Sequence, residues 1–247
     1  MSLTVDVAGA ARDLEEAPAT EILRWAIAEV PRFAVSSSFG ADSAVLLHLL
    51  STVDAGVPVL FLETGFHFPE TLRYRRDLAA LLGLTDVRDL RAQLTVAEQA
   101  REHGGGLYVR DADACCAIRK VEPLNRALRE FDGWASGVRR EQTPERADTP
   151  VVQTVTREGR DLVKVSPLAR WSAQDVEDYL AAHALPRHPL AEAGYPSIGC
   201  APCTRAVAPG EDPRAGRWAG SAKTECGIHI ELPGEAVPVQ LSERSAR

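Results

Sequence analysis

Two pairs of cysteines stand out among the residues of this sequence that can carry chemistry. Cys115 and Cys116 are adjacent in DACCAIRK, and Cys200 and Cys203 form a C-x-x-C in GCAPCTR. Adjacent cysteines rarely form a disulfide with each other, because the ring it closes is strained. Four thiolates suit either a tetrahedral zinc ion or an iron–sulfur cluster. Neighbouring side chains point apart and chelate one zinc ion poorly, whereas a cubane offers each a separate iron, so this order favours a [4Fe-4S] cluster.

The alternative is that these four are buried structural cysteines, with a C-x-x-C that arose by chance. That interpretation explains poorly why four of the five cysteines fall into two such groups.

The fifth cysteine, Cys226, lies in KTECGIH between Lys223 and His229. Basic neighbours lower the pKa of a thiol and favour the nucleophilic thiolate. Cys226 is therefore a candidate nucleophile, and an inert cysteine is the alternative.

The bulk composition disfavours several classes of protein. A formal net charge of −7 over 247 residues disfavours wholesale nucleic-acid binding but is compatible with a local basic pocket for a small anion. No apolar stretch approaches the roughly 20 residues that span a bilayer. The first residues, MSLTVDVAGAARDLEEAP, lack the basic and apolar regions of a signal peptide. We therefore expect no membrane partner and a cytoplasmic location, where thiols stay reduced.

The elements that must position these residues alternate between strand and helix. Apolar periodicity predicts helices over 13–30, 41–50, 69–84, 121–131 and 172–185. Apolar runs predict strands at 33–35, 57–65 and 162–168, and a further strand followed by a basic turn is predicted within 133–142. Ser172 is the expected N-cap of the last helix, with Asp175 at its third position. This alternation favours an α/β fold with a doubly wound, parallel sheet.

The loop SSSFG follows a predicted strand and precedes a helix. Backbone N–H groups and the helix dipole favour an anion or a polar ligand at such a place. The loop lacks the G-K-[ST] of a Walker loop. Asp42 either contacts a ligand or occupies the first turn of the helix, where the dipole favours a carboxylate.

Several motifs together resemble the assimilatory sulfonucleotide reductases. SSSFGADS is similar to the modified phosphate loop of the PP-loop (adenine nucleotide α-hydrolase-like) superfamily, and the other motifs, in family order, are CCAIRKVEPL, GVRREQTPER, YPSIGCAPCTR, GEDPRAGRW and ECGIH. The resemblance covers about residues 33–229. The cysteine set resembles the iron–sulfur branch, the adenylyl-sulfate (APS) reductases, because the related phosphoadenylyl-sulfate (PAPS) reductases usually lack both cysteine pairs.

The resemblance implies a fold, a reaction and a set of site residues. The fold would be a mostly parallel, doubly wound sheet with helices on both faces and a C-terminal redox segment. The reaction would be thioredoxin-dependent reduction of APS to sulfite and AMP, with Cys226 carrying the sulfur as S-sulfocysteine while the cluster passes no electrons to the substrate. Nucleotide contacts would come from Ser36, Ser38, the backbone of Leu62 and Gly137, and the phosphosulfate would be held by Lys120, Arg146, Arg214 and Arg217.

Substrate choice is expected to favour APS, because the assignable basic residues are already committed to the phosphosulfate. Arg139 and Arg140 are the unassigned candidates that could bind the additional 3′-phosphate of PAPS.

We expect residues 1–204 to form the nucleotide-binding domain with the cluster ligands, and residues 205–247 to form a segment that carries Cys226, is mobile around 205–229 and ends in a disordered tail over 230–247. A homo-oligomer and glutaredoxin as the donor stay open. The alternatives are a PAPS reductase, an ATP-using adenylating enzyme of the same superfamily, and a zinc-stabilised binding module.

Overall fold

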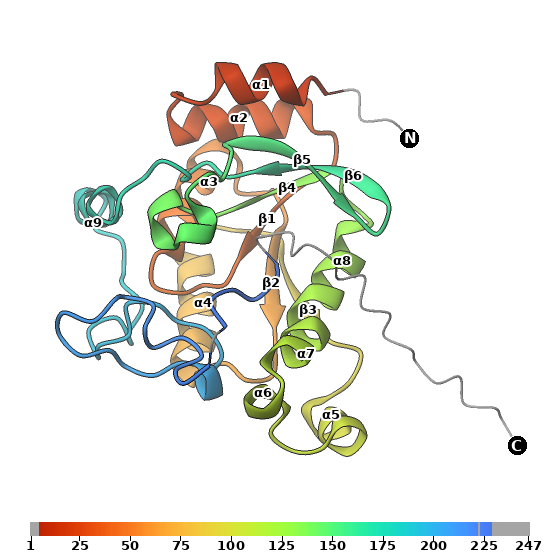
Figure 1. Cartoon of the computed structure of the whole chain (residues 1–247). Coiled ribbons are helices and arrows are strands. Elements are labelled where there is room, and N and C mark those ends of the chain that lie inside the picture. The colour runs from red at the N-terminus through yellow and green to blue at the C-terminus, as the bar shows by residue number, and fades with distance from the viewer. Residues whose placement is uncertain (1–4, 222, 229–247) are drawn as a thin grey trace, which may run out of the picture.

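A six-stranded sheet forms the centre of the molecule (Figure 1). The structure, a computed structural model, describes residues 5–221 and 223–228. The strand order is β3-β2-β1-β4-β6-β5, and all neighbours are parallel except β5 and β6, which are antiparallel. The strands are β1 (Phe33–Ser37), β2 (Val59–Glu63), β3 (Val87–Arg91), β4 (Gly133–Ser136), β5 (Val152–Arg157) and β6 (Arg160–Val165). The predicted α/β class and mostly parallel sheet are confirmed.

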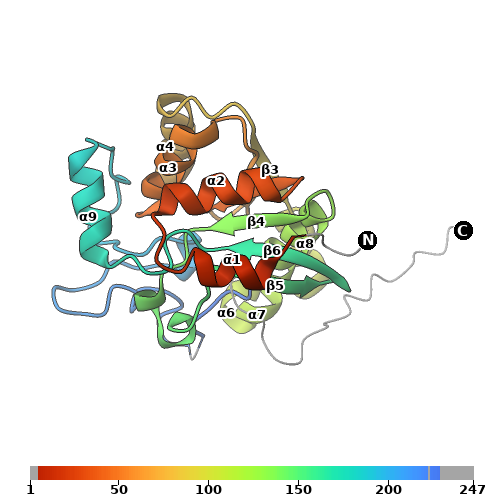
Figure 2. The same cartoon turned by 90° about the horizontal axis from the view of Figure 1, so that it is seen from above.

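Helices cover both faces of this sheet, and Figure 2 shows α3 and α4 on one side with α6 and α7 on the other. The helices are α1 (Val7–Asp13), α2 (Ala19–Glu29), α3 (Ser43–Asp54), α4 (Pro69–Leu81), α5 (Val96–His103), α6 (Leu107–Arg110), α7 (Ala112–Cys116), α8 (Glu122–Leu128) and α9 (Ala173–Ala182). Short turns of other helix types are η1 (Ala117–Val121, a π-helix), η2 (Arg140–Gln142), η3 (Pro144–Arg146) and η4 (Ala201–Cys203). No helix among the described residues is long and apolar enough to cross a bilayer.

Alternate residues of the central strands point into two separate cores. Val35 and Val59 belong to the larger core under α2, α3 and α9, whereas Ala34, Leu60 and Trp134 belong to the core under α8. Strands buried on both faces read as continuous apolar runs, and this explains why β1 and β2 were predictable.

The predicted helix over 13–30 is wrong in its extent. The chain forms α1 and α2 with a break at residues 14–18, and Pro18 takes an extended conformation just before α2 begins. Proline fixes its own φ, and its ring disfavours a helical conformation in the residue before it. The helix predicted over 41–50 begins two residues later, at Ser43, so the preceding loop includes Asp42.

Other local predictions are confirmed. Pro69 is at the start of α4, and Gly83 follows its end with a φ of +63°, the left-handed conformation that favours glycine. Ser172 accepts from the backbone N–H of Asp175, whose carboxylate accepts from the backbone of Ser172. This capping box fixes the start of α9.

Candidate functional site

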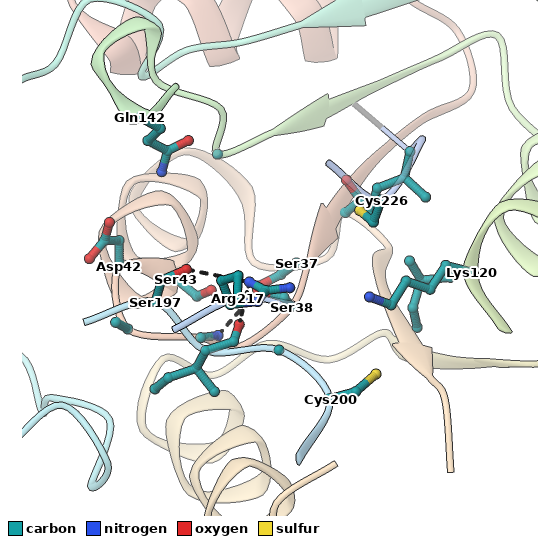
Figure 3. A pocket seen from close by; sticks show the side chains of 18 of the residues that line it. Ser37, Ser38, Asp42, Ser43, Lys120, Gln142, Ser197, Cys200, Arg217 and Cys226 are labelled. Carbon is teal, nitrogen blue, oxygen red and sulfur yellow. Dashed lines mark hydrogen bonds between the residues drawn. The ribbon is translucent and has the colours of Figure 1, made fainter. Parts of the chain in front are cut away.

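A cavity of about 190 Å³ opens at the carboxyl ends of β1, β2 and β4 (Figure 3). From β1 the chain continues through α3 to β2 on one side, whereas β4 pairs with β1 on the other side. Ligands of open α/β sheets bind where the strand order reverses in this way.

Every residue predicted to contact the nucleotide or its phosphosulfate lines this one cavity, and so does Cys226. The residues are Ser36, Ser38, Leu62, Lys120, Gly137, Arg146, Arg214, Arg217 and Cys226. They come from four parts of the fold, namely the sheet edge, η1, η3 and the irregular chain after α9. The cavity gathers the predicted residues, and their roles stay predictions.

The loop after β1 is fixed by its own serines. Ser36 Oγ donates to the carbonyl of Ala135 (3.2 Å), and the N–H of Gly40 donates to Ser38 Oγ (3.3 Å). Phe39, which lies between Ser38 and Gly40, has a φ of +47° and is fully buried against Phe61. A bulky residue adopts this left-handed conformation only when its surroundings hold it there. The aromatic anchor therefore holds the serines at the cavity.

Leu62 lies near the end of β2, Gly137 immediately follows β4, and both line the cavity. The carbonyl of Leu62 accepts from Nε2 of His67 (2.8 Å), and burial lowers the pKa of His67. A Cβ atom on Gly137 would touch only Leu46, at an ordinary 3.6 Å, so contacts within the protein leave room for one. Close approach of a ligand to Gly137 stays a prediction.

Lys120 extends into the cavity between Cys226 and Cys200 (Figure 3). Burial alone would lower the pKa of this amine, but the nearby Cys200, Cys226 and Cys116 outweigh that effect and raise it. Lys120 is four residues beyond Cys116 on the π-helix η1, so one short segment carries both groups. Lys120 thus carries a fixed positive charge between the two sets of thiols.

Arg217 lies across the backbone of Gly199. A Cβ atom at Gly199 would be 2.4 Å from its Nη2, so this close approach requires glycine. The guanidinium donates to Ser197 Oγ (3.3 Å) and stacks 4.6 Å from the ring centre of Trp218. Its Nε is buried with no partner, which leaves donor capacity unused at the cavity.

Sequence reasoning missed Glu225, although it lines the cavity and immediately precedes Cys226. Its carboxylate forms a two-pronged ion pair with Arg146, through Nε at 2.6 Å and Nη2 at 2.7 Å. Arg214 Nη2 is 3.5 Å from the same carboxylate. Burial and the nearby Arg146 lower the pKa of Arg214. The motif ECGIH contains this glutamate, but the motif alone does not reveal its partners.

The four paired cysteines line a second, smaller cavity, with Arg119 and Lys120 in its wall. All are free thiols, and burial raises the pKa of Cys116 to about 12 and that of Cys203 to about 11. Among the described residues, no group of three or more potential ligands is arranged to hold a single metal ion.

All four cysteines line this one cavity, which is compatible with the predicted cluster, and cluster binding stays a prediction. Two buried donors near these cysteines lack hydrogen-bond partners, namely Arg119 Nη2 in the cavity wall and Trp218 Nε1, whose ring packs with Cys116 and Cys226. Such N–H groups are suited to donate to sulfur.

Arg139 and Arg140 do not line the nucleotide cavity. Arg139 is buried and pairs with Asp42 (2.7 Å) and Glu141 (3.3 Å), whereas Arg140 pairs with Glu15 (2.7 Å). Asp42 does line the cavity, where its ion pair with Arg139 offsets its charge. His229 and the tail over 230–247 lie outside the described residues.

Comparison with known proteins gives a consistent picture. The family model described as "Phosphoadenosine phosphosulfate reductase domain" matches residues 32–206. A protein named adenosine 5'-phosphosulfate reductase, from Streptomyces coelicolor, is 50% identical over 221 residues, or 89% of this chain and 92% of that protein. One named phosphoadenosine 5'-phosphosulfate reductase, from Gloeobacter violaceus, is 46% identical over 200 residues, or 80% and 82%. The crystal structure of a Candida auris PAPS reductase, in a phosphate complex, aligns with a TM-score of 0.70 at 28% identity over 84% of this chain and 99% of that one.

Proposed function

We propose that this chain, which belongs to the phosphoadenosine phosphosulfate reductase domain family, is an oxidoreductase that reduces APS to sulfite and AMP. One observation carries the proposal: the thiol of Cys226 and four cationic side chains line the same cavity at the nucleotide-binding edge of the sheet. A thiol nucleophile surrounded by cations suits a small substrate with a phosphate–sulfate anhydride.

The first step would form a covalent enzyme intermediate. The thiolate of Cys226 attacks the sulfate sulfur, a sulfur–sulfur bond forms, and the bond from that sulfur to the bridging oxygen breaks. AMP leaves with the electron pair of the broken bond, and the enzyme keeps an S-sulfocysteine. A donor thiolate then attacks Sγ of Cys226 and releases sulfite, and the second donor thiol resolves the mixed disulfide.

The cationic residues would stabilise different groups in this reaction. Lys120 lies next to Cys226 and the cluster thiols, where its charge would favour the thiolate and the developing charge on the sulfate. Arg146, Arg214 and Arg217 would offset the charge growing on the departing phosphate. Ser36, Ser38, Leu62 and Gly137 would bind the adenosine at the sheet edge.

Cys115, Cys116, Cys200 and Cys203 would hold a [4Fe-4S] cluster. When bound, the cluster would supply negative charge beside Lys120 and join α7 to the segment around η4. Arg119 and Trp218 would donate hydrogen bonds to its sulfur atoms.

Thioredoxin is the proposed donor, since it supplies the two thiols that the second step requires. Residues 205–247 would act as the redox segment, because Cys226 must face a buried substrate and then a bulky protein. A reduced donor favours a cytoplasmic location. A homo-oligomer is compatible with this function but nothing in the site requires it.

The main alternative is a PAPS reductase, the name borne by the Gloeobacter violaceus relative. Two observations favour APS. Neither Arg139 nor Arg140 lines the cavity, and each is already engaged by a carboxylate, Asp42 for Arg139 and Glu15 for Arg140.

The test is anaerobic purification with a visible spectrum, followed by assay of sulfite from APS and PAPS side by side with reduced thioredoxin. We expect brown protein, sulfite from APS and a lower kcat/KM for PAPS. Equal or reversed efficiencies would contradict the substrate choice, absence of sulfite from both would contradict the reaction, and zinc without acid-labile sulfide would contradict the cluster.

A further inference from the structure

A single buried carboxylate ties the nucleophile's segment to the cavity. Glu225, next to Cys226, keeps only 4% of its side chain exposed, and Arg146 keeps 7%. The ion pair between Arg146 and Glu225 has two contacts. Arg214 and Thr143 also lie 3.5 Å and 3.3 Å from Oε1 of Glu225. The other polar links of this segment are more exposed, such as that from Thr224 to Glu145 (3.0 Å). Glu225 therefore provides the most buried polar anchor of the described chain around Cys226.

A carboxylate at this position is unexpected on electrostatic grounds. A negative charge beside a thiol disfavours the thiolate, and it repels an anionic substrate. Its charge is tolerated here because Arg146 and Arg214 neutralise it. Guanidinium groups bind carboxylates, phosphates and sulfates with the same planar fork. Glu225 thus binds the guanidinium groups of Arg146 and Arg214, which a substrate anion would also bind.

We infer that Glu225 is a positioning residue that competes with the substrate's anion for Arg146 and Arg214, and that this competition couples substrate binding to release of the Cys226 segment. The inference rests on the proposed function for the identity of the substrate, whereas the competition itself requires only an anion. In the structure the carboxylate of Glu225 holds both arginines, and Cys226 is 8% exposed. When an anion takes the arginines, the anchor weakens, and the nucleophile's segment becomes free to move.

Such coupling is reciprocal, so removing the carboxylate should have two effects. Without the carboxylate, anions bind more tightly because the arginines are free. Without the anchor, Cys226 is held less firmly, so its access to reagents rises even before an anion binds. A residue with a merely structural role would not tighten anion binding.

The test uses three variants of the full-length, cluster-loaded protein. Glu225→Gln removes the charge and keeps the shape, Glu225→Asp keeps the charge on a shorter arm, and Glu211→Gln is the matched control. Glu211 pairs with Arg205 on the same segment (2.9 Å) but does not line the cavity. Inorganic sulfate is titrated calorimetrically, and iodoacetamide labelling of the Cys226 peptide is timed by mass spectrometry.

For Glu225→Gln we expect sulfate to bind about tenfold more tightly and Cys226 to be labelled about tenfold faster, a coupling within the usual range. Glu211→Gln should match the wild type, and Glu225→Asp should recover part of the slow labelling. With APS, Glu225→Gln should lower KM and leave kcat near the wild-type value, because bound substrate has already displaced the carboxylate in the wild type.

Sulfate affinity and labelling of Glu225→Gln equal to those of Glu211→Gln would overturn the inference. The wild type gives a second test that does not depend on folding of the variants: sulfate should accelerate labelling of Cys226, and unchanged or slower labelling would contradict the competition. If APS yields no sulfite with the wild type, the proposed function fails, while the sulfate and labelling results still decide the role of Glu225.

Discussion

The nucleotide cavity has two walls of different construction. The sheet wall consists of the loop at 36–42, the end of β2 and Gly137, and it rests on parallel strands that are buried on both faces. The coil wall consists of residues 196–221 and 223–228, which contain η4 and one isolated bridge between Thr204 and Arg217. Ion pairs, hydrogen bonds and a small apolar cluster around Trp218 and Cys226 hold the coil wall, whereas the sheet wall rests on the two large apolar cores.

The two walls also carry residues with different proposed roles. The sheet wall carries the groups proposed to bind the nucleotide, which need a constant shape. The coil wall carries Cys200, Cys203 and Cys226, together with Arg214 and Arg217. The proposed nucleophile and two of the four proposed cluster ligands therefore lie on irregular chain. Ion pairs exchange partners more readily than packed side chains rearrange. The reacting wall is therefore the part that is suited to move.

The largest expected effect comes from Cys200→Ala, because this residue links the coil wall to Cys115 and Cys116 of α7. We expect loss of the visible cluster absorbance, loss of sulfite formation and faster proteolysis within 196–228, because the cluster no longer joins the two segments. Absorbance, sulfite assay and timed proteolysis check this. Cys226→Ser is the control and should keep the absorbance; normal absorbance in Cys200→Ala would remove this residue from the ligand set.

Arg217→Ala should reduce kcat/KM for APS by about 10²–10³, the usual cost of losing one donor to a developing oxyanion. Arg205→Ala, on the same wall but paired with Glu211 away from the cavity, is the control and should retain near-normal rates. Steady-state kinetics with APS measures both. Equal losses in the two variants would show that the coil wall responds to any change of charge.

Acid should destabilise the fold around His188, which lies in the irregular chain after α9. His188 is fully buried, receives the N–H of Leu190 on Nδ1 (3.1 Å) and lies 3.0 Å from Thr71 of α4 through Nε2. Burial lowers the pKa of His188 to about 4, from the 6.5 of a free side chain. Between these values the unfolded chain binds more protons, so the free energy of unfolding should fall as pH drops from 6.5 to 4, by at most about 3 kcal/mol.

Denaturant unfolding across this pH range measures the effect. The control is His188→Gln, which should show a smaller pH dependence than the wild type. Identical pH profiles for the two proteins would exclude His188 as the source.

The smallest effects are expected from Arg139→Ala and Arg140→Ala. Neither arginine lines the cavity: Arg139 pairs with Asp42 of the sheet wall, and Arg140 pairs with Glu15 outside it. The ratio of kcat/KM for APS to that for PAPS should stay as in the wild type, as measured with both substrates in parallel. A selective loss of PAPS activity in either variant would assign that arginine to the 3′-phosphate.

The two walls also differ in how far the sequence predicts them. The sheet wall follows from short-range patterns: the apolar runs of β1 and β2 and the loop between β1 and α3 are all local. The edge strands β3 and β5 were not predicted, because VRDLR and VQTVTR alternate apolar and polar residues without forming an apolar run. A strand at the edge of a sheet has less apolar surface to bury, so its pattern is weaker.

In the coil wall, local patterns indicated Cys200, Cys203 and Cys226 as candidates, whereas Arg214 and Arg217 came only from the family resemblance. Neither source gave their positions in space. Glu225 shows the limit, since its partner Arg146 is 79 residues away in the chain. No local pattern in the sequence predicts an ion pair between residues so far apart in the chain. Such a contact depends on how the coil folds back over the sheet.

The central claim is that Cys226 attacks the sulfur of APS, and mass spectrometry can detect the product of that step. The anaerobically purified protein is incubated with APS without any donor, and its peptides are examined by mass spectrometry beside those of Cys226→Ser. We predict a sulfite-sized mass increase on the peptide that contains Cys226, AMP release in equal amount, and neither in the variant. An unmodified Cys226 in the wild type, or an adduct on a different cysteine, would contradict the account.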